Sequence, residues 1–309
     1  MAVDIGGKSD PIKARRKRRV FIFVVVSLLA LGFYGLIIFG LAWNTVCPKP
    51  SKMRTNPTEH GMSYENATFN SFDATLLSGW LCLPAQPKAV VILCHGVDGN
   101  RASMIPKAKL LYAAGFGVLL FDFRTRGESG GRLCTIGKLE TDDLISAVKW
   151  VQSHPKTASL KIGVLGDSMG ASVSIMGAAR CVSILAVVAE SPFDRLDHAV
   201  ANHFSMLFGK ASPILEVPVQ WVGEKLIGSK ATAISPIDEI AHISPRPILI
   251  IADQEDDLCR KEEIEGLFTK AGLPKSLWSV PKADHIEAYD VAKEEYESRV
   301  IHFFNQSLK

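Results

Sequence analysis

A glycine-flanked serine at the junction of a predicted strand and a predicted helix constrains this chain more than any other feature. Residues 166–170 read GDSMG; they follow the apolar run 161–165 and precede the small-residue segment 171–179. This G-x-S-x-G pattern is typical of a sharp, strained turn that projects a nucleophilic serine out of the fold, because the glycines let strand and helix approach closely. The alternative is a helix start capped by Ser168, and the strand–turn–helix context favours the nucleophile.

An uncharged apolar segment of 23 residues, 20–42, lies near the N-terminus. It is long enough to cross a hydrocarbon core about 30 Å thick at about 1.5 Å per residue. Five Lys and Arg residues, 15–19, precede it directly, and Trp43 follows it. Basic residues favour the cytoplasmic side of a membrane and Trp favours the interface. We expect a single-pass transmembrane helix with a disordered, basic cytoplasmic tail, residues 1–19, and the rest of the chain on the non-cytoplasmic side, which is the periplasm in a bacterium.

A cleaved signal peptide is the alternative interpretation of this segment. Its apolar core is normally about 7–15 residues long and is followed by a small-residue cleavage site. The longer core here, and the sequence LAWN at residues 41–44, favour a retained anchor.

The net charge is concentrated beside that segment. Residues 1–19 carry a net +5 and the whole chain +3, so residues 20–309 carry a net −2. A basic segment next to a membrane is attracted to anionic headgroups, and nothing in this balance indicates a nucleic-acid partner. The six cysteines form no C-x-x-C pair. Cys82 and Cys94, on successive predicted strands, are candidates for a disulfide, but buried thiols are the preferred interpretation.

The remaining chain predicts an α/β domain over residues 64–309, joined to the membrane segment by a proline-containing linker, residues 43–63. Strands are predicted at 67–72, 76–83, 89–94, 117–123, 161–165, 184–189, 248–252 and 276–280. Helices are predicted at 104–114, at 142–153, after Ser168 and at about 291–305. The first two strands form an antiparallel pair, and the later alternation predicts a mostly parallel, doubly wound sheet of about eight strands. The alternation pauses between 190 and 243, where we expect a small helical cap, about residues 194–240.

A nucleophilic serine needs a base, and the base needs an orienting acid. Ligands of a parallel sheet sit at the carboxyl ends of its strands, so the loops that follow strands are the places to search. His285 lies in such a loop and is the candidate base. The acid stays open at this point among five residues that follow strands: Asp194, Asp253, Glu255, Asp256 and Asp257.

Acyl transfer also needs hydrogen-bond donors for the oxyanion. The backbone N–H of Met169 follows the nucleophile at the head of its helix. A second donor is expected from the loop after the strand 89–94, where Val97 is the candidate. His95 in this loop is then structural or supports the oxyanion donors.

Several segments of the chain resemble the α/β-hydrolase superfamily, over roughly residues 64–309. They are His95-Gly96 with Gly99, the segment DFRTRGES at 122–129, the elbow at 166–170, Ser191-Pro192, residues 251–258 and residues 283–285. The resemblance implies the α/β-hydrolase fold and a triad in the order Ser168, Asp256, His285, with Asp253 standing where the family usually has glycine. It also implies that residues 124–129 form a structural turn. The form of the chain resembles membrane-anchored esterases, lipases and serine-aminopeptidase-like members.

These observations predict a serine hydrolase that cleaves an ester or related acyl bond, with a small-molecule or lipid-like acyl substrate and no metal or organic cofactor. Acyl transfer, thioester cleavage and peptide cleavage use the same triad and are the alternatives within enzymes. A non-catalytic, membrane-anchored interaction module is the alternative of another class.

Overall fold

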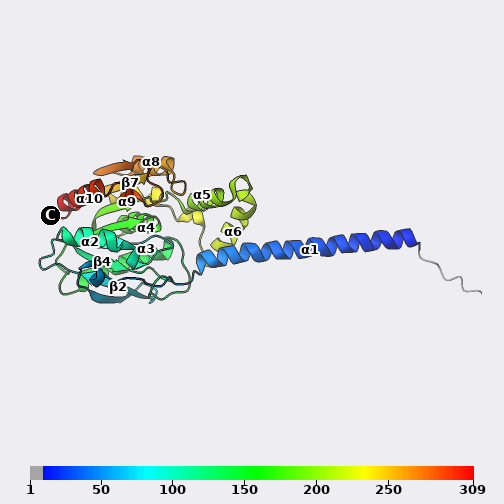
Figure 1. Ribbon diagram of the computed structural model, residues 1–309, viewed down its shortest axis with the longest axis horizontal. Helices are drawn as coiled ribbons and strands as arrows, with labels where there is room; N and C mark the ends of the chain where they lie inside the picture. Colours follow the sequence, from blue (N-terminus) through cyan, green and yellow to red (C-terminus); the bar gives the residue numbers. More distant parts are fainter. Residues whose placement is uncertain (1–9) are drawn as a thin grey trace, which may run out of the picture.

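The computed structural model describes residues 10–309 and consists of an α/β core, a helical hairpin and a protruding N-terminal helix (Figure 1). The N-terminal helix, α1 (Pro11–Val46), has 36 residues. Its N-cap is Asp10, whose side chain accepts a hydrogen bond from the Ile12 amide at 3.0 Å. Capping by Asp10, proline at the first position and the good helix propensity of Lys and Arg explain why the basic residues are helical. The expected disordered tail is therefore wrong for residues 11–19, and residues 1–9 lie outside the described part of the chain.

The core is built on one eight-stranded sheet with the order β1-β2-β4-β3-β5-β6-β7-β8. Its strands are β1 (Glu65–Asn70), β2 (Leu76–Cys82), β3 (Val90–Cys94), β4 (Gly117–Phe121), β5 (Ile162–Asp167), β6 (Ile184–Glu190), β7 (Ile248–Asp253) and β8 (Lys275–Val280). β2 pairs antiparallel with both β1 and β4, and every other pair is parallel. The predicted fold class, with its antiparallel first pair, is confirmed.

Helices cover both faces of the sheet, because alternate residues of each strand point to opposite sides. On β3, Val90 and Ile92 belong to one buried cluster and Val91 and Leu93 to the other. The first cluster packs beneath α3 (Lys138–Ser153), α4 (Met169–Arg180) and α8 (Lys261–Lys270). The second packs beneath α2 (Ile105–Ala113), α9 (Ala288–Val291) and α10 (Lys293–Ser307). With both faces covered, the functional groups are left to the carboxyl edge of the strands.

A helical hairpin follows β6 and occupies the predicted cap region. It consists of α5 (Leu196–Phe208), a short 3-10 turn η3 (Gly209–Ala211) and α6 (Ser212–Ile227). Further short turns and α7 (Pro236–Glu239) lead back to β7. The hairpin projects from the core alongside α1, so that α6 and the end of α1 lie side by side (Figure 1).

Other differences from the sequence expectations concern element ends. The expected linker, residues 43–63, is helical at its start, where α1 continues to Val46, and again at η1 (Pro57–His60). Helix α8 was not predicted, because its surface sequence KEEIEGLFTK has only two fully buried positions. β4 lies between β2 and β3, so Cys82 and Cys94 are not on neighbouring strands. All six cysteines lie in the described part of the chain and are free thiols.

Candidate active site

Ser168 lies at the turn between β5 and α4, in a backbone conformation that non-glycine residues rarely adopt. Its φ is 55° and its ψ −119°. The turn is tight on both sides: a Cβ at Gly166 would lie 2.2 Å from the Gly170 carbonyl oxygen, and one at Gly170 would lie 2.1 Å from that of Cys94. Only glycine fits at these two positions, and the strain at Ser168 is of the kind that clusters at functional sites.

The structure brings Ser168, His285 and Asp256 together from three separate loops at the carboxyl edge of the sheet. The Ser168 Oγ lies 2.8 Å from Nε2 of His285, and Nδ1 of the same ring lies 2.7 Å from Oδ2 of Asp256. The other oxygen of Asp256 accepts hydrogen bonds from the amides of Leu258 and Cys259, each at 2.8 Å. These bonds fix the carboxylate, which leaves Nδ1 of His285 as the donor to Asp256 and Nε2 free to accept from the serine.

The other candidate acids do not contact His285. Asp253 is buried and accepts a hydrogen bond from the Ser191 hydroxyl at 2.7 Å. Asp194 is bonded to Nδ1 of His198 at 2.9 Å. Glu255 and Asp257 are exposed. Among the described residues, Asp256 is therefore the acid placed to orient the imidazole.

Burial and the carboxylates act in opposite directions on the imidazole of His285. Burial alone would lower the pKa of His285, because it disfavours the charged ring. The hydrogen bond and the charge of Asp256 outweigh burial, with help from Asp253 and Asp167, and raise the pKa of His285 above its ordinary value of 6.5. An imidazole held in this way accepts a proton readily and remains stable once charged.

The expected oxyanion donors, the amides of Met169 and Val97, belong to two segments that meet at Ser168. Met169 is the first residue of α4, and the first four N–H groups of a helix have no partner within the helix. The loop that carries Val97 runs past the serine: a Cβ at Gly96 would lie 3.5 Å from the Ser168 Cβ. Both amides are thus at the correct edge for an oxyanion site.

His95 has a structural role in that loop. Its Nδ1 donates to the Gly96 carbonyl at 2.7 Å, and its Nε2 accepts from the Phe123 amide at 3.1 Å. Complete burial lowers the pKa of His95 to about 4, so its ring is neutral at ordinary pH. Because both ring nitrogens are occupied, His95 holds the loop in place and does not act as a base.

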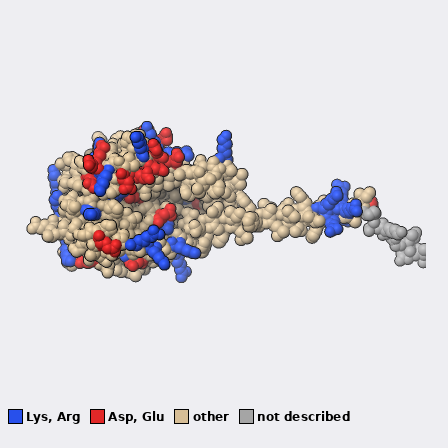
Figure 2. Space-filling view, in the orientation of Figure 1, with Lys and Arg blue, Asp and Glu red and all other residues tan. Residues whose placement is uncertain are grey.

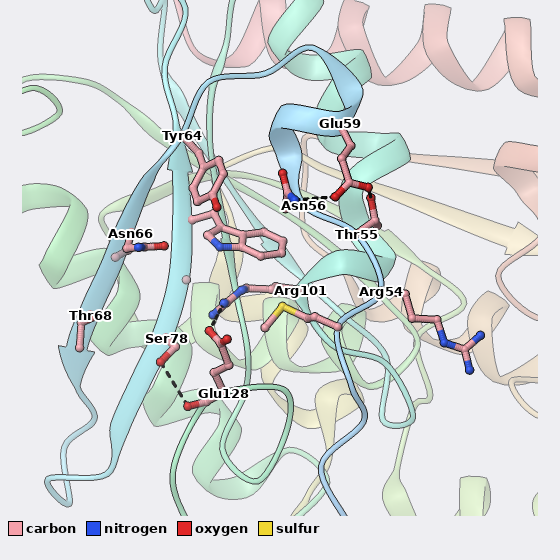
Figure 3. Close-up of a pocket in the computed structure, with 14 residues that line it drawn as sticks. Arg54, Thr55, Asn56, Glu59, Tyr64, Asn66, Thr68, Ser78, Arg101 and Glu128 are labelled. Carbon is pink, nitrogen blue, oxygen red and sulfur yellow. Dashed lines mark hydrogen bonds and ion pairs between the residues drawn. The ribbon is translucent and has the colours of Figure 1, made fainter.

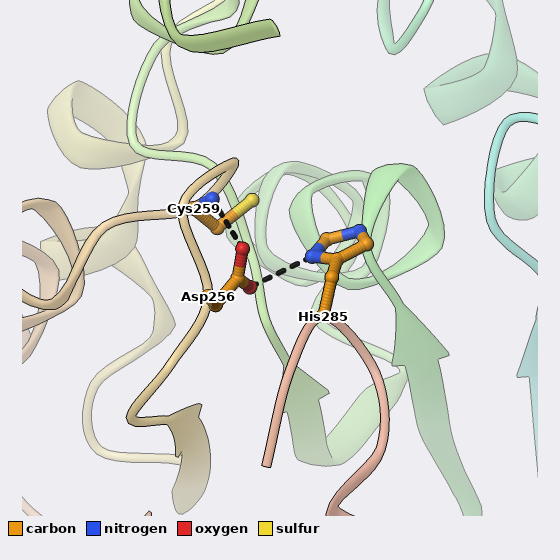
Figure 4. A group of neighbouring side chains, drawn as sticks. All are labelled: Asp256, Cys259 and His285. Atoms are coloured by element: carbon orange, nitrogen blue, oxygen red, sulfur yellow. Dashed lines mark hydrogen bonds and ion pairs between the residues drawn. The ribbon is translucent and has the colours of Figure 1, made fainter. Parts of the chain in front are cut away.

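Two groups of side chains have the residue types of a metal site. Asp256, Cys259 and His285 have their ligand atoms within 4.8 Å of one another (Figure 4). Burial, reinforced by the charge of Asp256, raises the pKa of the Cys259 thiol well above its ordinary value, and both ring nitrogens of His285 already contact Asp256 and Ser168. The second group is Asp194, His198 and Glu263 at the base of the hairpin. Its members bond to protein: His198 to Asp194, and Glu263 to Asn202 at 2.8 Å.

Comparison with known proteins identifies the family of the chain. Residues 85–235 match the family model described as serine aminopeptidase, S33. The solved structure of the Pyrococcus furiosus esterase Pf2001 superposes with a TM-score of 0.73 at 29% identity, covering 84% of this chain and 100% of that one. The chain belongs to the α/β-hydrolase superfamily. Among curated relatives, this hydrolase is 29% identical to the uncharacterized protein YqkD of Bacillus subtilis over 74% of this chain and 75% of that one. It is 26% identical to protein bem46 of Schizosaccharomyces pombe over 85% and 84% of the two chains.

One group near the site of this hydrolase was missed by the sequence analysis. Lys107 of α2 is buried, and its Nζ lies 2.7 Å from Asp167 and 2.6 Å from Glu190. Burial alone would lower the pKa of Lys107, but the two carboxylates raise it above its ordinary value. Burial raises the pKa of Asp167 to about 6. The charge of Lys107 opposes this shift, and the charge of Glu190 adds to it. A lone lysine on the apolar face of helix 105–113 was the signal that could have found this group.

A separate polar hollow of about 610 Å³ lies on the β1–β2 side of the molecule (Figure 3). It is bounded by residues 53–59 on one side and by β1 and β2 on the other. Arg101 lines it, stacked over Trp80 and paired with Glu128 and Asp122. Asp122 also accepts from the Glu128 amide at 2.9 Å, and the Ser129 amide donates to the Arg126 carbonyl at 2.9 Å, so residues 124–129 form the structural turn that the resemblance implied. The hollow does not include Ser168, Asp256 or His285.

Proposed function

We propose that this hydrolase is a serine esterase that cleaves a carboxylic ester through a covalent acyl-enzyme. The observation that carries the proposal is the continuous chain of short contacts from Ser168 to His285 to Asp256. The strained turn at Ser168 and the 29% identity to a protein whose structure is described as an esterase support it.

In the proposed reaction, Ser168 attacks the ester carbonyl while Nε2 of His285 takes the hydroxyl proton. The Met169 and Val97 amides hold the oxyanion, and Asp256 stabilises the imidazolium. His285 then gives its proton to the leaving alcohol, which departs and leaves Ser168 acylated. Water, deprotonated by the same imidazole, releases the acid and restores the serine.

Acyl transfer, thioester cleavage and peptide cleavage are alternatives that use the same acyl-enzyme. The description of the matching family model, serine aminopeptidase, keeps peptide cleavage among them. A non-catalytic interaction module is disfavoured, because such a role would not need a strained serine next to an imidazole whose pKa is raised.

The proposed location follows from α1, which contains a long apolar segment whose residues are almost all exposed. A helix of this length and composition is able to span a membrane, and a signal sequence has the same properties. We propose the spanning role, with the basic residues 15–19 on the cytoplasmic side and the hydrolase domain on the other. Retention of residues 20–42 in the mature protein, measured by intact mass, and resistance to alkaline extraction from membranes would support it; a mature chain that begins after residue 42 would contradict it.

A fluorophosphonate probe tests the proposed chemistry. Wild-type protein should be labelled, Ser168→Ala should not, and Ser172→Ala, one turn further along α4, should be labelled like the wild type. A panel of p-nitrophenyl esters, thioesters and aminoacyl p-nitroanilides should then show that esters are preferred. Folded wild-type protein that is not labelled would refute catalysis, whereas labelling with peptide cleavage alone would refute the ester assignment.

A further inference from the structure

The hairpin of α5 and α6 carries an exposed apolar surface at the end that points away from the sheet (Figure 1). Six large apolar side chains, each between 40% and 64% exposed, form this hairpin patch: Met206, Leu207, Phe208, Ile214, Val217 and Trp221. Between residues 204 and 222 the sequence holds only two charged residues, Lys210 and Glu216. In the face of the molecule shown in Figure 2, the region beside α1 is likewise almost free of charge. A patch of this kind marks a surface that binds a protein or a membrane.

Helix α6 runs beside the C-terminal part of α1 in the same direction. The Tyr34 hydroxyl donates a hydrogen bond to the Ile214 carbonyl near the start of α6. Twelve residues further along α1, Val46 Cγ2 lies 4.0 Å from the position of a Cβ at Gly223. Four side chains that are at most 9% exposed close the contact between α1 and the hairpin: Ile38, Ala42, Phe204 and Val219. Because the hairpin packs against α1, the depth of α1 in a membrane also sets the depth of the hairpin.

The length of α1 places the tip of the hairpin below the membrane surface. A hydrocarbon core about 30 Å thick takes about 20 residues of helix, so a span that starts at Val20 ends near Phe39. Ile214 is level with Tyr34. Tyr34 is five residues before Phe39, so at about 1.5 Å per residue it lies about 7 Å inside the hydrocarbon. If the span ends instead at Ala42, the tip lies about 12 Å inside. Tilting α1 lengthens the span and does not bring the tip out.

Two tryptophans mark the same height on the two helices. The contacts at Ile214 and Gly223 place Trp221 on α6 level with about residue 43 of α1, which is Trp43. Trp221 is 58% exposed and Trp43 is 49% exposed. Exposed tryptophans at a common height are typical of a membrane–water interface. The two charged side chains below that level, Lys210 and Glu216, are long, and the stem of Lys210 can carry its charge back toward the headgroups.

The other end of the hairpin reaches the candidate active site. Asn202 of α5 donates to the carbonyl of Leu258, two residues after Asp256, at 3.0 Å. The end of α1 meets the same edge of the sheet, where the Val46 carbonyl accepts from the Cys134 amide at 2.7 Å in the loop after β4. The carboxyl edge of the sheet, which carries Ser168, thus faces the membrane end of the molecule.

We propose that the hairpin patch lies within the leaflet opposite the basic residues 15–19 and that the substrate is an acyl ester of a membrane lipid, taken from that leaflet. This inference rests on the proposed anchoring by α1 and, for the substrate, on the proposed ester hydrolysis. The occupant of the patch is the hydrocarbon of the bilayer, because the patch is continuous with the apolar surface of α1 and lies at the depth of its span.

Quenching of tryptophan fluorescence by phosphatidylcholine brominated on its acyl chains tests the position of the hairpin without any activity. The full chain is reconstituted in these vesicles as two single variants. Fluorescence of the Trp43→Phe variant reports the position of Trp221, and fluorescence of the Trp221→Phe variant reports that of Trp43. The double variant gives the background fluorescence of the other three tryptophans. We expect the bromolipid to quench both Trp43 and Trp221. Quenching of Trp43 without Trp221 would overturn the inference and leave the anchor intact. If neither tryptophan is quenched, both the further inference and the proposed anchoring by α1 are overturned.

A charge variant tests the substrate. Leu207→Glu with Ile214→Glu places carboxylates on the patch, and Phe72→Glu with Leu273→Glu is the matched control at exposed apolar positions away from the hairpin. In vesicles of phosphatidylcholine carrying a fluorogenic long-chain acyl ester, we expect the patch variant to lose hydrolysis by about tenfold or more, because charge is costly in hydrocarbon. Its hydrolysis of soluble p-nitrophenyl butyrate, and that of the control variant on both substrates, should stay unchanged. Equal activity of the patch variant and the control variant on vesicles would overturn the inference. Absence of any ester hydrolysis in the wild type would overturn the proposed function. In that case the quenching experiment still decides the position of the hairpin.

Discussion

The imidazole of His285 contacts the Ser168 hydroxyl at 2.8 Å. The nucleophile and its proposed base are thus within hydrogen-bond distance of each other. What sets the efficiency of this pair is the tautomer and orientation of the ring, which depend on the contact of its other nitrogen with Asp256 at 2.7 Å.

Replacing that carboxylate isolates its contribution. We expect Asp256→Asn to lower kcat on p-nitrophenyl esters by about 10⁴-fold, because an amide can hold the ring in the wrong tautomer and does not stabilise the imidazolium. Asp257→Asn, at the exposed neighbouring position, should keep wild-type activity. Steady-state kinetics of both variants provide the measurement, and comparable losses in the two would show that Asp256 has no special role.

The pH dependence of activity should reflect the perturbed imidazole. His285 must be neutral to accept the serine proton, so activity is lost as the pH falls through its pKa. Because Asp256 raises that pKa against the effect of burial, the midpoint of the acidic limb of kcat/KM should lie above pH 6.5. A profile of kcat/KM from pH 5 to 9 with an uncharged ester provides the measurement. An acidic limb centred clearly below 6.5 would contradict the assignment of His285.

The sequence predicted the sheet and the location of the serine and histidine, because these follow from apolar runs and from the short turn after each strand. It left five acids open for a physical reason. Asp253 ends β7 and Asp256 follows it by three residues, and only the fold turns one toward Ser191 and the other toward His285. The Lys107 group joins residues from α2, β5 and β6, so no local pattern describes it. The contact of α1 with α6 joins segments about 180 residues apart, and periodicity within either helix does not reveal the partner.

The buried Lys107 should contribute to stability. Lys107→Met leaves the carboxylates of Asp167 and Glu190 in the interior without a cation, which costs about 3–5 kcal/mol in comparable buried pairs. Lys109→Met, exposed on the same helix, should change the free energy of unfolding little. Urea unfolding of both variants in detergent provides the measurement. Adding Glu190→Gln to Lys107→Met should recover part of the loss, and no recovery would indicate that packing, not charge, is responsible.

Asp253 should make stability depend on pH. Burial first, and then the charge of Glu190, raise the pKa of Asp253 from 3.8 to about 7. Between these values the folded protein holds a proton that the unfolded chain has released, so this contribution to stability is complete at low pH and is lost as the pH rises toward 7. The slope is at most about 1.4 kcal/mol per pH unit. Asp253→Asn should remove it, so that the variant gains stability relative to the wild type between pH 5 and 8 in urea unfolding. Parallel curves for the two proteins would contradict the raised pKa.

The tight turn around Ser168 predicts a contrast between two glycine substitutions. Gly170→Ala places a Cβ 2.1 Å from the Cys94 carbonyl oxygen, a backbone atom of a central strand that cannot move without disturbing the sheet. We expect a loss of several kcal/mol, or failure to fold, together with loss of fluorophosphonate labelling. Gly266→Ala, in the middle of α8, meets only the Ile237 side chain at 3.4 Å and should raise stability by up to about 1 kcal/mol through helix propensity. Thermal unfolding distinguishes the two, and a Gly170→Ala protein as stable and as reactive as the wild type would show that the close approach of α4 to β3 is not required.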